Sequence, residues 1–161
     1  MGPRRSRLVA ALAVALLAAG LLVTVGLVPA PWADDRAEVR ILGPDGERAV
    51  VDAEVADTPY ERYVGLSDHD GLEDGEGMLF VHGGEAERTY VMRGMEFDIG
   101  IAFVGADGRI TAIHEARAPG PGEDGEELRY SGRAKWVLEV PAGYFDEHGV
   151  EVGDEIEIDR G

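Results

Sequence analysis

Two carboxylates and one histidine in this chain have the surroundings that acid–base catalysis uses. Asp98 stands between two apolar residues, and Glu139 stands in the apolar run 137–140. Burial in such runs raises the pKa of a carboxyl group and demands a hydrogen-bonding partner. His114 is the best placed of the four histidines to act with them. Asp98, His114 and Glu139 are therefore the candidate catalytic residues, and a hydrolase that uses Asp98 or Glu139 with His114 is the alternative to a binding module.

The same residues also fit purely structural roles. In a strand, the period of two turns Glu139 away from Leu138 and Val140, which would leave its carboxylate on a solvated face. His114 would then be an ordinary core or surface histidine. The hydrolase hypothesis requires that the two carboxylates and His114 meet in one concave pocket.

Nucleophilic catalysis has little support in the sequence. Ser67 lies in the pentapeptide 65–69, which is Gly-x-Ser-x-His and not the Gly-x-Ser-x-Gly elbow of serine hydrolases. The chain contains no Cys, which excludes thiol nucleophiles, thiolate metal sites and disulfides. We expect Ser67 to cap or turn the loop after a short helix.

Methionines near a histidine suggest one metal site. The Met residues of the chain beyond residue 33 fall within 18 residues of each other and close to a His. Thioether and imidazole groups suit copper(I), although core packing explains methionine equally well. The acidic loop 68–76 resembles a calcium loop but has Leu72 where a third ligand is needed. We predict no cofactor, and name as candidate metal ligands Met78, His82, Met92 and Met95.

The elements that position these residues read mostly as strands. Short alternating or apolar runs are separated by Gly turns, and two Asp-Gly pairs predict hairpins over 38–55 and 99–116. We expect a mainly β (α+β) fold, as an antiparallel sheet or a partly closed β-barrel. The predicted strands are 38–42, 48–55, 78–82, 89–92, 99–104, 109–116, 134–140 and 155–158.

One or two short helices complete the predicted fold. Thr58, Pro59 and Glu61 form an N-cap, a first helical residue and a capping-box partner, which predicts a helix over 59–65. A second helix is expected over 142–147. The loop 120–127 is rich in Gly, Pro and acids, and we expect it to be mobile.

Charge is divided very unevenly along the chain. Residues 1–33 hold three Arg and no acid, whereas residues 34–161, called here the acidic domain, hold 12 bases and 32 acids. So acidic a surface repels phosphate backbones, which argues against nucleic acid as a partner. Many acids with one Lys and no Asn, Gln or Cys indicate adaptation to high salt, and we expect a haloarchaeal source.

The amino terminus predicts a membrane anchor. The 21 residues 8–28 contain Thr24 as their only polar side chain and follow three arginines, so they can span a bilayer with the arginines inside. The alternative is a cleaved signal peptide, but Pro31 disfavours cleavage at the nearby alanines. We predict an anchor and linker over 1–33 and a single-pass cell-membrane protein with the acidic domain outside, or a secreted protein if the segment is cleaved.

Five sequence motifs follow one another in the acidic domain. They are Glu61-Arg62-x-x-Gly65-Leu66-Ser67, Gly75-Glu76-Gly77-Met78-Leu79-Phe80, Tyr90-Val91-Met92-Arg93-x-Met95-x-Phe97-Asp98-Ile99-x-Ile101-x-Phe103, Leu138-Glu139-Val140-Pro141-Ala142-Gly143 and Gly149-Val150-x-Val152-Gly153-Asp154. In this order and spacing, over about residues 48–158, they resemble the domain of unknown function 192 family, although this chain has Val91-Met92 where the family usually has Trp-Met. The resemblance implies a compact, mainly β fold, often exported or anchored, and no established activity.

These motifs contain residues that also stand out by their chemistry. Arg88 and Arg93 flank the Met run in a domain poor in bases and could bind an anionic group, although nearby carboxylates could equally pair with them. We predict an accessory or binding module for a small ligand or a protein partner. The candidate ligand-binding residues are Arg62, Met78, Met92, Arg93 and Asp98.

Overall fold

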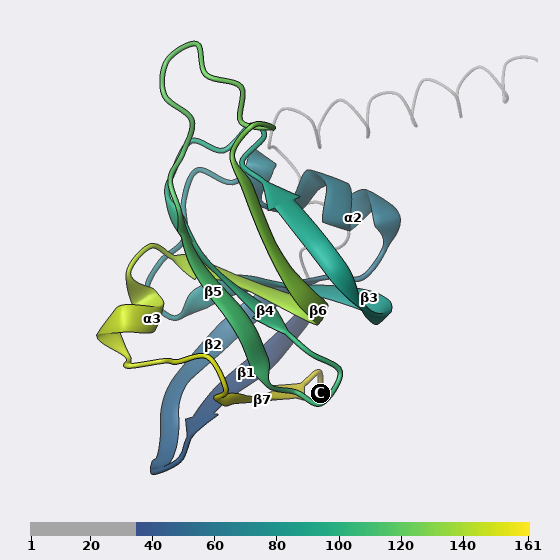
Figure 1. Ribbon diagram of the computed structural model, residues 1–161, viewed down its shortest axis with the longest axis vertical. Coiled ribbons are helices and arrows are strands. Elements are labelled where there is room, and N and C mark those ends of the chain that lie inside the picture. Colours follow the sequence, from purple (N-terminus) through teal and green to yellow (C-terminus); the bar gives the residue numbers. More distant parts are fainter. Residues whose placement is uncertain (1–34) are drawn as a thin grey trace, which may run out of the picture. The chain divides into compact units, whose positions relative to one another are not determined.

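The structure is a computed structural model that describes residues 35–161 (Figure 1). The predicted anchor and linker over residues 1–33 lie outside the described residues. Residues 34–161 form one compact unit. No helix within 35–161 is long and apolar enough to cross a membrane.

Seven strands, two short α-helices and one 3-10 turn make up this domain. All the predicted strands are present, but 78–82 and 89–92 belong to one long strand and not to two. The second helix is shorter than the predicted 142–147. The elements are β1 (Arg36–Gly43), β2 (Gly46–Ala56), α2 (Pro59–Val64), η1 (Gly65–Asp68), β3 (Glu76–Val91), β4 (Ile99–Val104), β5 (Ile110–Ala116), β6 (Arg129–Pro141), α3 (Tyr144–Glu147) and β7 (Glu155–Asp159).

The strands form a mixed, open sheet in the order β5-β4-β6-β3-β2-β1-β7. The predicted hairpins β1–β2 and β4–β5 are antiparallel, as expected. The expectation of a purely antiparallel sheet is wrong at one pair, since β2 and β3 run parallel. The segment between them contains α2 and η1, and it carries the chain back to the end at which β2 began.

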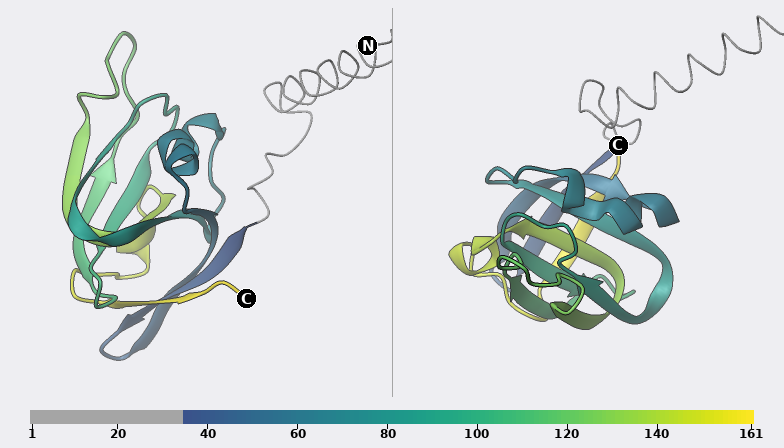
Figure 2. Two further views of the ribbon diagram at one scale, coloured as in Figure 1. Left: turned by 90° about the vertical axis from the view of Figure 1, so that its right-hand side faces the viewer. Right: turned by 90° about the horizontal axis from the view of Figure 1, so that it is seen from above.

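The two ends of the sheet approach each other without a continuous ladder. An isolated bridge joins Arg109 to Glu155, and Ile110 N donates to Asp154 O at 2.9 Å. The start of β1 and the carboxyl terminus also lie side by side (Figure 2), where Arg160 Nη2 is 2.7 Å from Asp35 Oδ2.

Helix α2 begins at the predicted capping box. Thr58 Oγ1 accepts from Glu61 N at 3.2 Å, and Glu61 Oε2 accepts from Thr58 N at 2.9 Å. The helix ends because Gly65 adopts φ 51° and ψ −136°, a conformation open essentially to glycine alone. This sharp end turns the chain directly into η1, which places Leu66 in the apolar core.

Two apolar clusters cover the two faces of the sheet. One contains Val39, Val51, Leu79, Leu138 and Phe145, and the other contains aromatic and sulfur-bearing side chains of β3, β4 and β6. From Trp136 to Leu138, successive residues of β6 alternate between the clusters, as a strand requires. The second cluster includes Met78, Phe80, Met92, Met95, Ile101, Phe103 and Val137.

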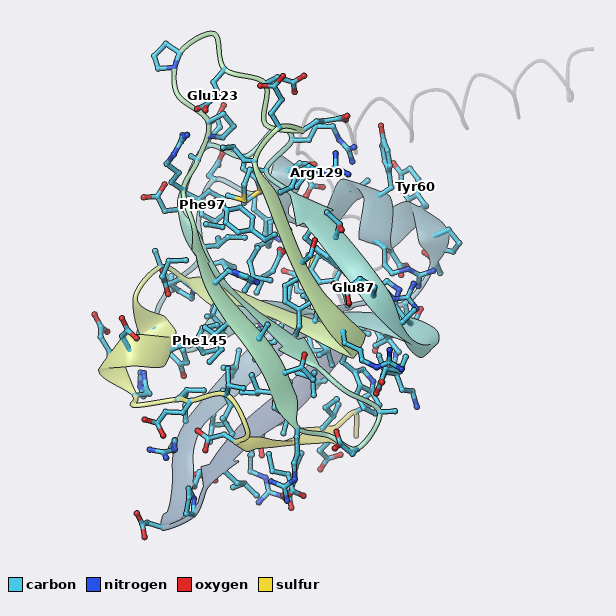
Figure 3. The ribbon with its side chains drawn as sticks, viewed as in Figure 1. Tyr60, Glu87, Phe97, Glu123, Arg129 and Phe145 are labelled. Carbon is cyan, nitrogen blue, oxygen red and sulfur yellow. The ribbon has the colours of Figure 1, made fainter. Side chains whose placement is uncertain are left out.

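The loop between β5 and β6 extends beyond the sheet, as the label at Glu123 shows (Figure 3). Arg117 holds this loop through two hydrogen bonds of 2.7 Å to the Glu123 carboxylate. Gly125 O also accepts from Met92 N at 3.0 Å. The predicted loop 120–127 is therefore tied both to itself and to the segment after β3.

Candidate functional site

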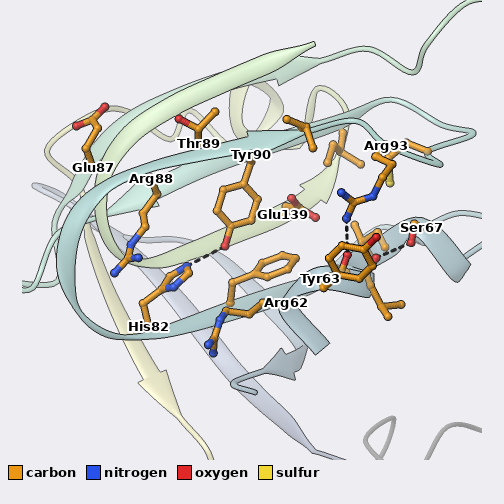
Figure 4. A pocket seen from close by; sticks show the side chains of 17 residues that line it. Arg62, Tyr63, Ser67, His82, Glu87, Arg88, Thr89, Tyr90, Arg93 and Glu139 are labelled. Atoms are coloured by element: carbon orange, nitrogen blue, oxygen red, sulfur yellow. Dashed lines mark hydrogen bonds between the residues drawn. The ribbon is translucent and has the colours of Figure 1, made fainter. Parts of the chain in front are cut away.

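A pocket of about 450 Å³ opens between the α2–η1 segment and the second half of β3. Figure 4 shows that side chains of both segments surround it and that β6 contributes Glu139 from behind. Apolar lining comes mainly from Leu66, Phe80 and Ile99. The polar and aromatic residues that define its chemistry are Arg62, Tyr63, His82, Arg88, Tyr90 and Glu139.

Glu139 lies at the inner side of the pocket. Its register partners are Met78 on β3 and Ile101 on β4, so it belongs to the face of the second apolar cluster, and it is only 5% exposed. No residue within 35–161 forms a hydrogen bond with its carboxyl group. Burial raises the pKa of Glu139 to about 8, against a smaller opposing effect of His69. Glu139 is therefore a neutral carboxylic acid at pH 7, and the expected solvated face is wrong.

Tyr90 and His82 form a second polar unit beside Glu139. His82 Nε2 lies 3.0 Å from Tyr90 Oη. Burial, reinforced by the charges of Arg88 and Arg62, lowers the pKa of His82 to about 4. Burial and then the nearby Glu139 raise the pKa of the Tyr90 phenol. Both side chains are therefore uncharged at neutral pH, and they form a hydrogen bond with each other.

Arg62 and Arg88 supply positive charge to the pocket. Arg62 Nη1 donates to Val81 O at 2.9 Å and also to Asp57 O. Arg88 Nη2 donates to Gly84 O at 2.7 Å, and its Nε makes a longer bond of 3.4 Å to Ala134 O. All these acceptors are backbone carbonyls. In the part of the chain that the structure describes, neither guanidinium forms an ion pair with a carboxylate.

This lack of carboxylate partners is unusual in the acidic domain. Eight of its eleven arginines form ion pairs with residues of the described range, as the composition leads one to expect. Arg93 is among them, since its Nη1 lies 3.1 Å from Glu126 Oε1. Its guanidinium also stacks 4.1 Å from the centre of the Tyr63 ring. Arg93 therefore borders the pocket with its charge already neutralised.

The three predicted catalytic residues do not come together. Asp98 is exposed, against the expectation that its neighbours bury it, and its Oδ1 accepts from Ala118 N at 2.7 Å. His114 Nε2 donates to Ser131 O at 2.9 Å, and its ring packs on Phe103. Only Glu139 lines the pocket, so these residues give the hydrolase hypothesis no shared geometry.

The predicted metal ligands mostly belong to the core. Met78 and Met92 are buried in the second apolar cluster, Met95 borders both the cluster and the pocket, and His82 is engaged by Tyr90. Within residues 35–161, no group of three or more His, Cys, Asp or Glu side chains could hold a metal ion. The copper site remains a prediction, with core packing as a sufficient account of the methionines.

Sequence reasoning missed part of the site. Arg88 stood out only as a base near the Met run, and Tyr90 and Tyr63 were not selected. A usable signal was the strand period of two, which places Arg88 and Tyr90 on one face of β3. The contribution of α2 could not be seen in this way, because it depends on how the β2–β3 connection crosses the sheet.

Similar proteins share this fold. A protein of unknown function from Novosphingobium aromaticivorans DSM 12444 superposes with a TM-score of 0.65 and is 31% identical, over 74% of this chain and 83% of that one. A Sinorhizobium meliloti 1021 protein, described as a "putative transcription regulator", has a TM-score of 0.68 and 26% identity, over 76% of this chain and 93% of that one. Curated proteins give no match.

The family follows from a sequence comparison. The DUF192 family model, described as "Uncharacterized ACR", matches residues 40–158. This range contains all the strands except the beginning of β1 and the end of β7, together with every residue that lines the pocket. The chain therefore belongs to the DUF192 family, a family without an established biochemical activity.

Proposed function

We propose that the acidic domain is an extracytoplasmic binding module whose pocket holds a small organic anion. The observation that carries this proposal is the pair Arg62 and Arg88. Both residues line the pocket, and both guanidinium groups lack an ion-pair partner among residues 35–161 in a domain with far more acids than bases. A ligand that brings its own carboxylate or phosphate would supply the missing negative charge.

The two arginines also keep hydrogen-bond donors for such a ligand. A guanidinium has five N–H donors. The bonds that Arg62 makes within the described residues all use Nη1, and those of Arg88 use Nη2 and Nε. The remaining donors of each group can therefore serve an anion without breaking the contacts that hold the side chain.

Binding accounts for the pocket better than catalysis does. Ser67 is the only serine that lines it, and its hydroxyl donates to Val64 O at 2.6 Å, which leaves no base aligned to activate it. His82 and Tyr90 are uncharged and bonded to each other. A hydrolase that uses Glu139 with His114 remains the alternative, and it would need His114 to leave Ser131 O.

Calorimetric titration with heptanoate tests the proposal. In about 1 M KCl we expect wild type to bind and Arg88→Gln or Arg62→Gln to weaken binding about tenfold or more, as loss of a charge-assisted hydrogen bond would do. The matched control is Arg40→Gln, which removes an equal charge from β1, where Arg40 Nη2 pairs with Glu157 at 2.7 Å. Equal weakening by all three variants would show a general charge effect and contradict the proposal.

We also propose that residues 8–28 anchor the domain in the cell membrane, with the domain outside. The length and apolarity of this segment and the arginines before it support this topology. Mass spectrometry of the native protein gives a direct test. An intact amino terminus is expected, whereas loss of about thirty residues would mean a cleaved signal peptide and a secreted protein.

The composition supports a salt-adapted, haloarchaeal-type protein that does not bind nucleic acid. The acidic domain would strongly repel DNA, so the description of the Sinorhizobium relative as a regulator does not transfer easily to this chain. Molar salt screens the mutual repulsion of its carboxylates. We expect a clearly higher melting temperature by circular dichroism in about 2 M KCl than in dilute buffer, and equal values would contradict salt adaptation.

A further inference from the structure

We infer that the ligand binds with Glu139 in its protonated form, so that the Glu139 carboxyl group donates a hydrogen bond to an oxygen atom of an organic acid whose anionic end lies against Arg62 and Arg88. This inference rests on the proposed function, and it specifies the class of ligand. The ligand would be an elongated acid with an apolar stem and a second oxygen acceptor at the far end.

The position of Glu139 leaves the pocket as its only place to find a partner. It is 5% exposed on the central strand β6 and has no hydrogen bond within residues 35–161. Tyr90, whose pKa the charge of Glu139 raises, already bonds His82. Among the described residues, the Glu139 oxygens are not fully buried atoms without a partner, so they have accessible surface at the pocket that Glu139 lines, where a ligand oxygen can bond them.

Its register neighbours cannot satisfy it. Glu54, Met78, Glu139, Ile101 and His114 form one row across five strands, with their side chains on the same face. The immediate neighbours in this row are apolar. The polar members at its ends are engaged, since Glu54 Oε2 lies 3.2 Å from His69 Nε2 and His114 donates to Ser131 O.

The pocket has two chemically different ends. The charges of Arg62 and Arg88 lower the pKa of His82 and act on Tyr90, whereas His69 is the charged group that acts on Glu139. Figure 4 shows Tyr90 between Arg88 on one side and Glu139 on the other. A ligand that contacts both ends must extend past the Tyr90 ring and along apolar lining such as Phe80 and Ile99.

An oxygen acceptor suits Glu139 better than an ammonium group does. An ammonium would require an ionised Glu139 and a buried ion pair among the side chains of Met78, Phe80 and Ile101. The desolvation of two charges in such surroundings is seldom repaid without further hydrogen bonds. A neutral carboxylic acid that donates to a carbonyl or hydroxyl oxygen avoids this cost.

The inference predicts the sign of the pH dependence. Glu139 is raised to a pKa of about 8, so the donor is present below that pH and is lost as the pH rises through it. The pKa of His69 is raised, chiefly by its hydrogen bond with Glu54, and loss of its proton removes a charge that opposes protonation of Glu139, so it does not reverse the sign. The titratable and charged groups that line the pocket, share the row of Glu139 or act on its pKa are Glu54 on β2, Arg62 and Tyr63 on α2, His69 after η1, His82, Glu87, Arg88 and Tyr90 on β3, Arg93 after it, and His114 on β5.

Three matched acids test the inference by calorimetry: heptanoate, 6-oxoheptanoate and 6-aminohexanoate, each repeated with chains of about five to nine carbons. At pH 6.5 we expect the best oxo acid to bind about tenfold more tightly than its plain counterpart. Above pH 8 this advantage should fall by about tenfold per pH unit, because one proton is required.

Two variants serve as controls for the role of the Glu139 proton. Glu139→Gln keeps an N–H donor and should keep the advantage but lose its pH dependence. Glu87→Gln, a charge change at the same pocket, should leave the pH dependence unchanged.

The outcomes separate this inference from the proposed function. If both acids bind and Arg88→Gln weakens both, but the oxo acid has no pH-dependent advantage, the inference is overturned and the proposed function stands. If 6-aminohexanoate binds most tightly, and its affinity increases with pH, the inference is overturned in favour of an ionised Glu139. If no acid binds, or if Arg62→Gln and Arg88→Gln have no effect, the proposed function itself fails, and the inference with it.

A spectroscopic measurement on wild type avoids dependence on any variant. The ¹³C resonance of the Glu139 carboxyl should titrate with a midpoint near 8, and 6-oxoheptanoate should move the midpoint upward. A midpoint in the ordinary range of glutamate, or a downward movement with the oxo acid, would overturn the inference.

Discussion

Two buried carboxylates of this domain show how differently the same chemical group can be used. Asp154 and Glu139 are each 5% exposed. Asp154 Oδ2 lies 2.8 Å from Arg48 Nε, as an ion pair without hydrogen-bond geometry, and it also accepts from Glu151 N at 2.8 Å. Glu139 forms neither an ion pair nor a hydrogen bond within the described residues. Asp154 therefore has a structural role, whereas the carboxyl group of Glu139 can form a hydrogen bond with a ligand.

The difference arises from the elements around each residue. Asp154 lies in the turn before β7, where a chain neighbour and a side chain from β2 can reach it. Glu139 lies in mid-strand between apolar register partners, so nothing nearby in the sequence can bond it. A mid-strand acid that is covered but not bonded is thus a stronger sign of a ligand site than burial alone.

The largest expected effect concerns the pH dependence of stability. Folded Glu139 keeps its proton up to about pH 8, whereas the unfolded chain loses it near its ordinary pKa of 4.5. Because the folded pKa is raised, the stabilisation is present below pH 4.5 and is lost as the pH rises to 8. Relative to Glu139→Gln, wild type should lose about 4 kcal/mol of unfolding free energy between pH 5 and 8.

Urea unfolding of both proteins at several pH values measures this difference. Titrating pairs that do not act on Glu139, such as Arg117 with Glu123, are common to both chains and cancel in the comparison. Parallel stability curves for wild type and Glu139→Gln would show that Glu139 has an ordinary pKa, and the contrast with Asp154 would disappear.

The second-largest expected effect is the loss of stability when Asp154 is replaced. Asp154→Ala removes the partner of the half-buried Arg48 and the acceptor for Glu151 N, and it should cost about 2 to 3 kcal/mol of unfolding free energy. Asp52→Ala is the matched control, because Asp52 pairs with Arg36 at 2.8 Å on the surface. It should cost less than about 1 kcal/mol. Equal costs in urea unfolding would mean that burial gives Asp154 no special role.

Much of the fold could be predicted because its signals are local. The capping box at Thr58 and the Asp-Gly turns act over a few residues, and the structure has α2 and both hairpins where these signals place them. The parallel pairing of β2 with β3 could not be predicted from such signals. It depends on where the connecting segment crosses, which is decided by packing between residues distant in the sequence.

The candidate site shows the same limit. The alternation of a strand places Glu139 and Leu138 on opposite faces of the sheet. Whether the face of Glu139 is solvated or covered depends on β3, β4 and α2, which lie far away in the chain. The prediction that Asp98 is buried was wrong for the converse reason. Its sequence neighbours Phe97 and Ile99 are apolar, yet it precedes β4 in a segment where its side chain stays exposed and accepts from Ala118 N. Apolar neighbours in sequence do not bury a residue outside a regular element.

The smallest expected effect on stability compares an unpaired arginine with a paired one. Arg88→Gln removes bonds to two backbone carbonyls and no ion pair within residues 35–161, so we expect a change below about 1 kcal/mol, together with the loss of heptanoate binding. Arg48→Gln leaves Asp154 buried without its cation and should cost about 2 kcal/mol with binding unchanged. If Arg88→Gln destabilised the domain as much as Arg48→Gln in urea, the Arg88 guanidinium would be a structural group, and its missing carboxylate would no longer point to a ligand.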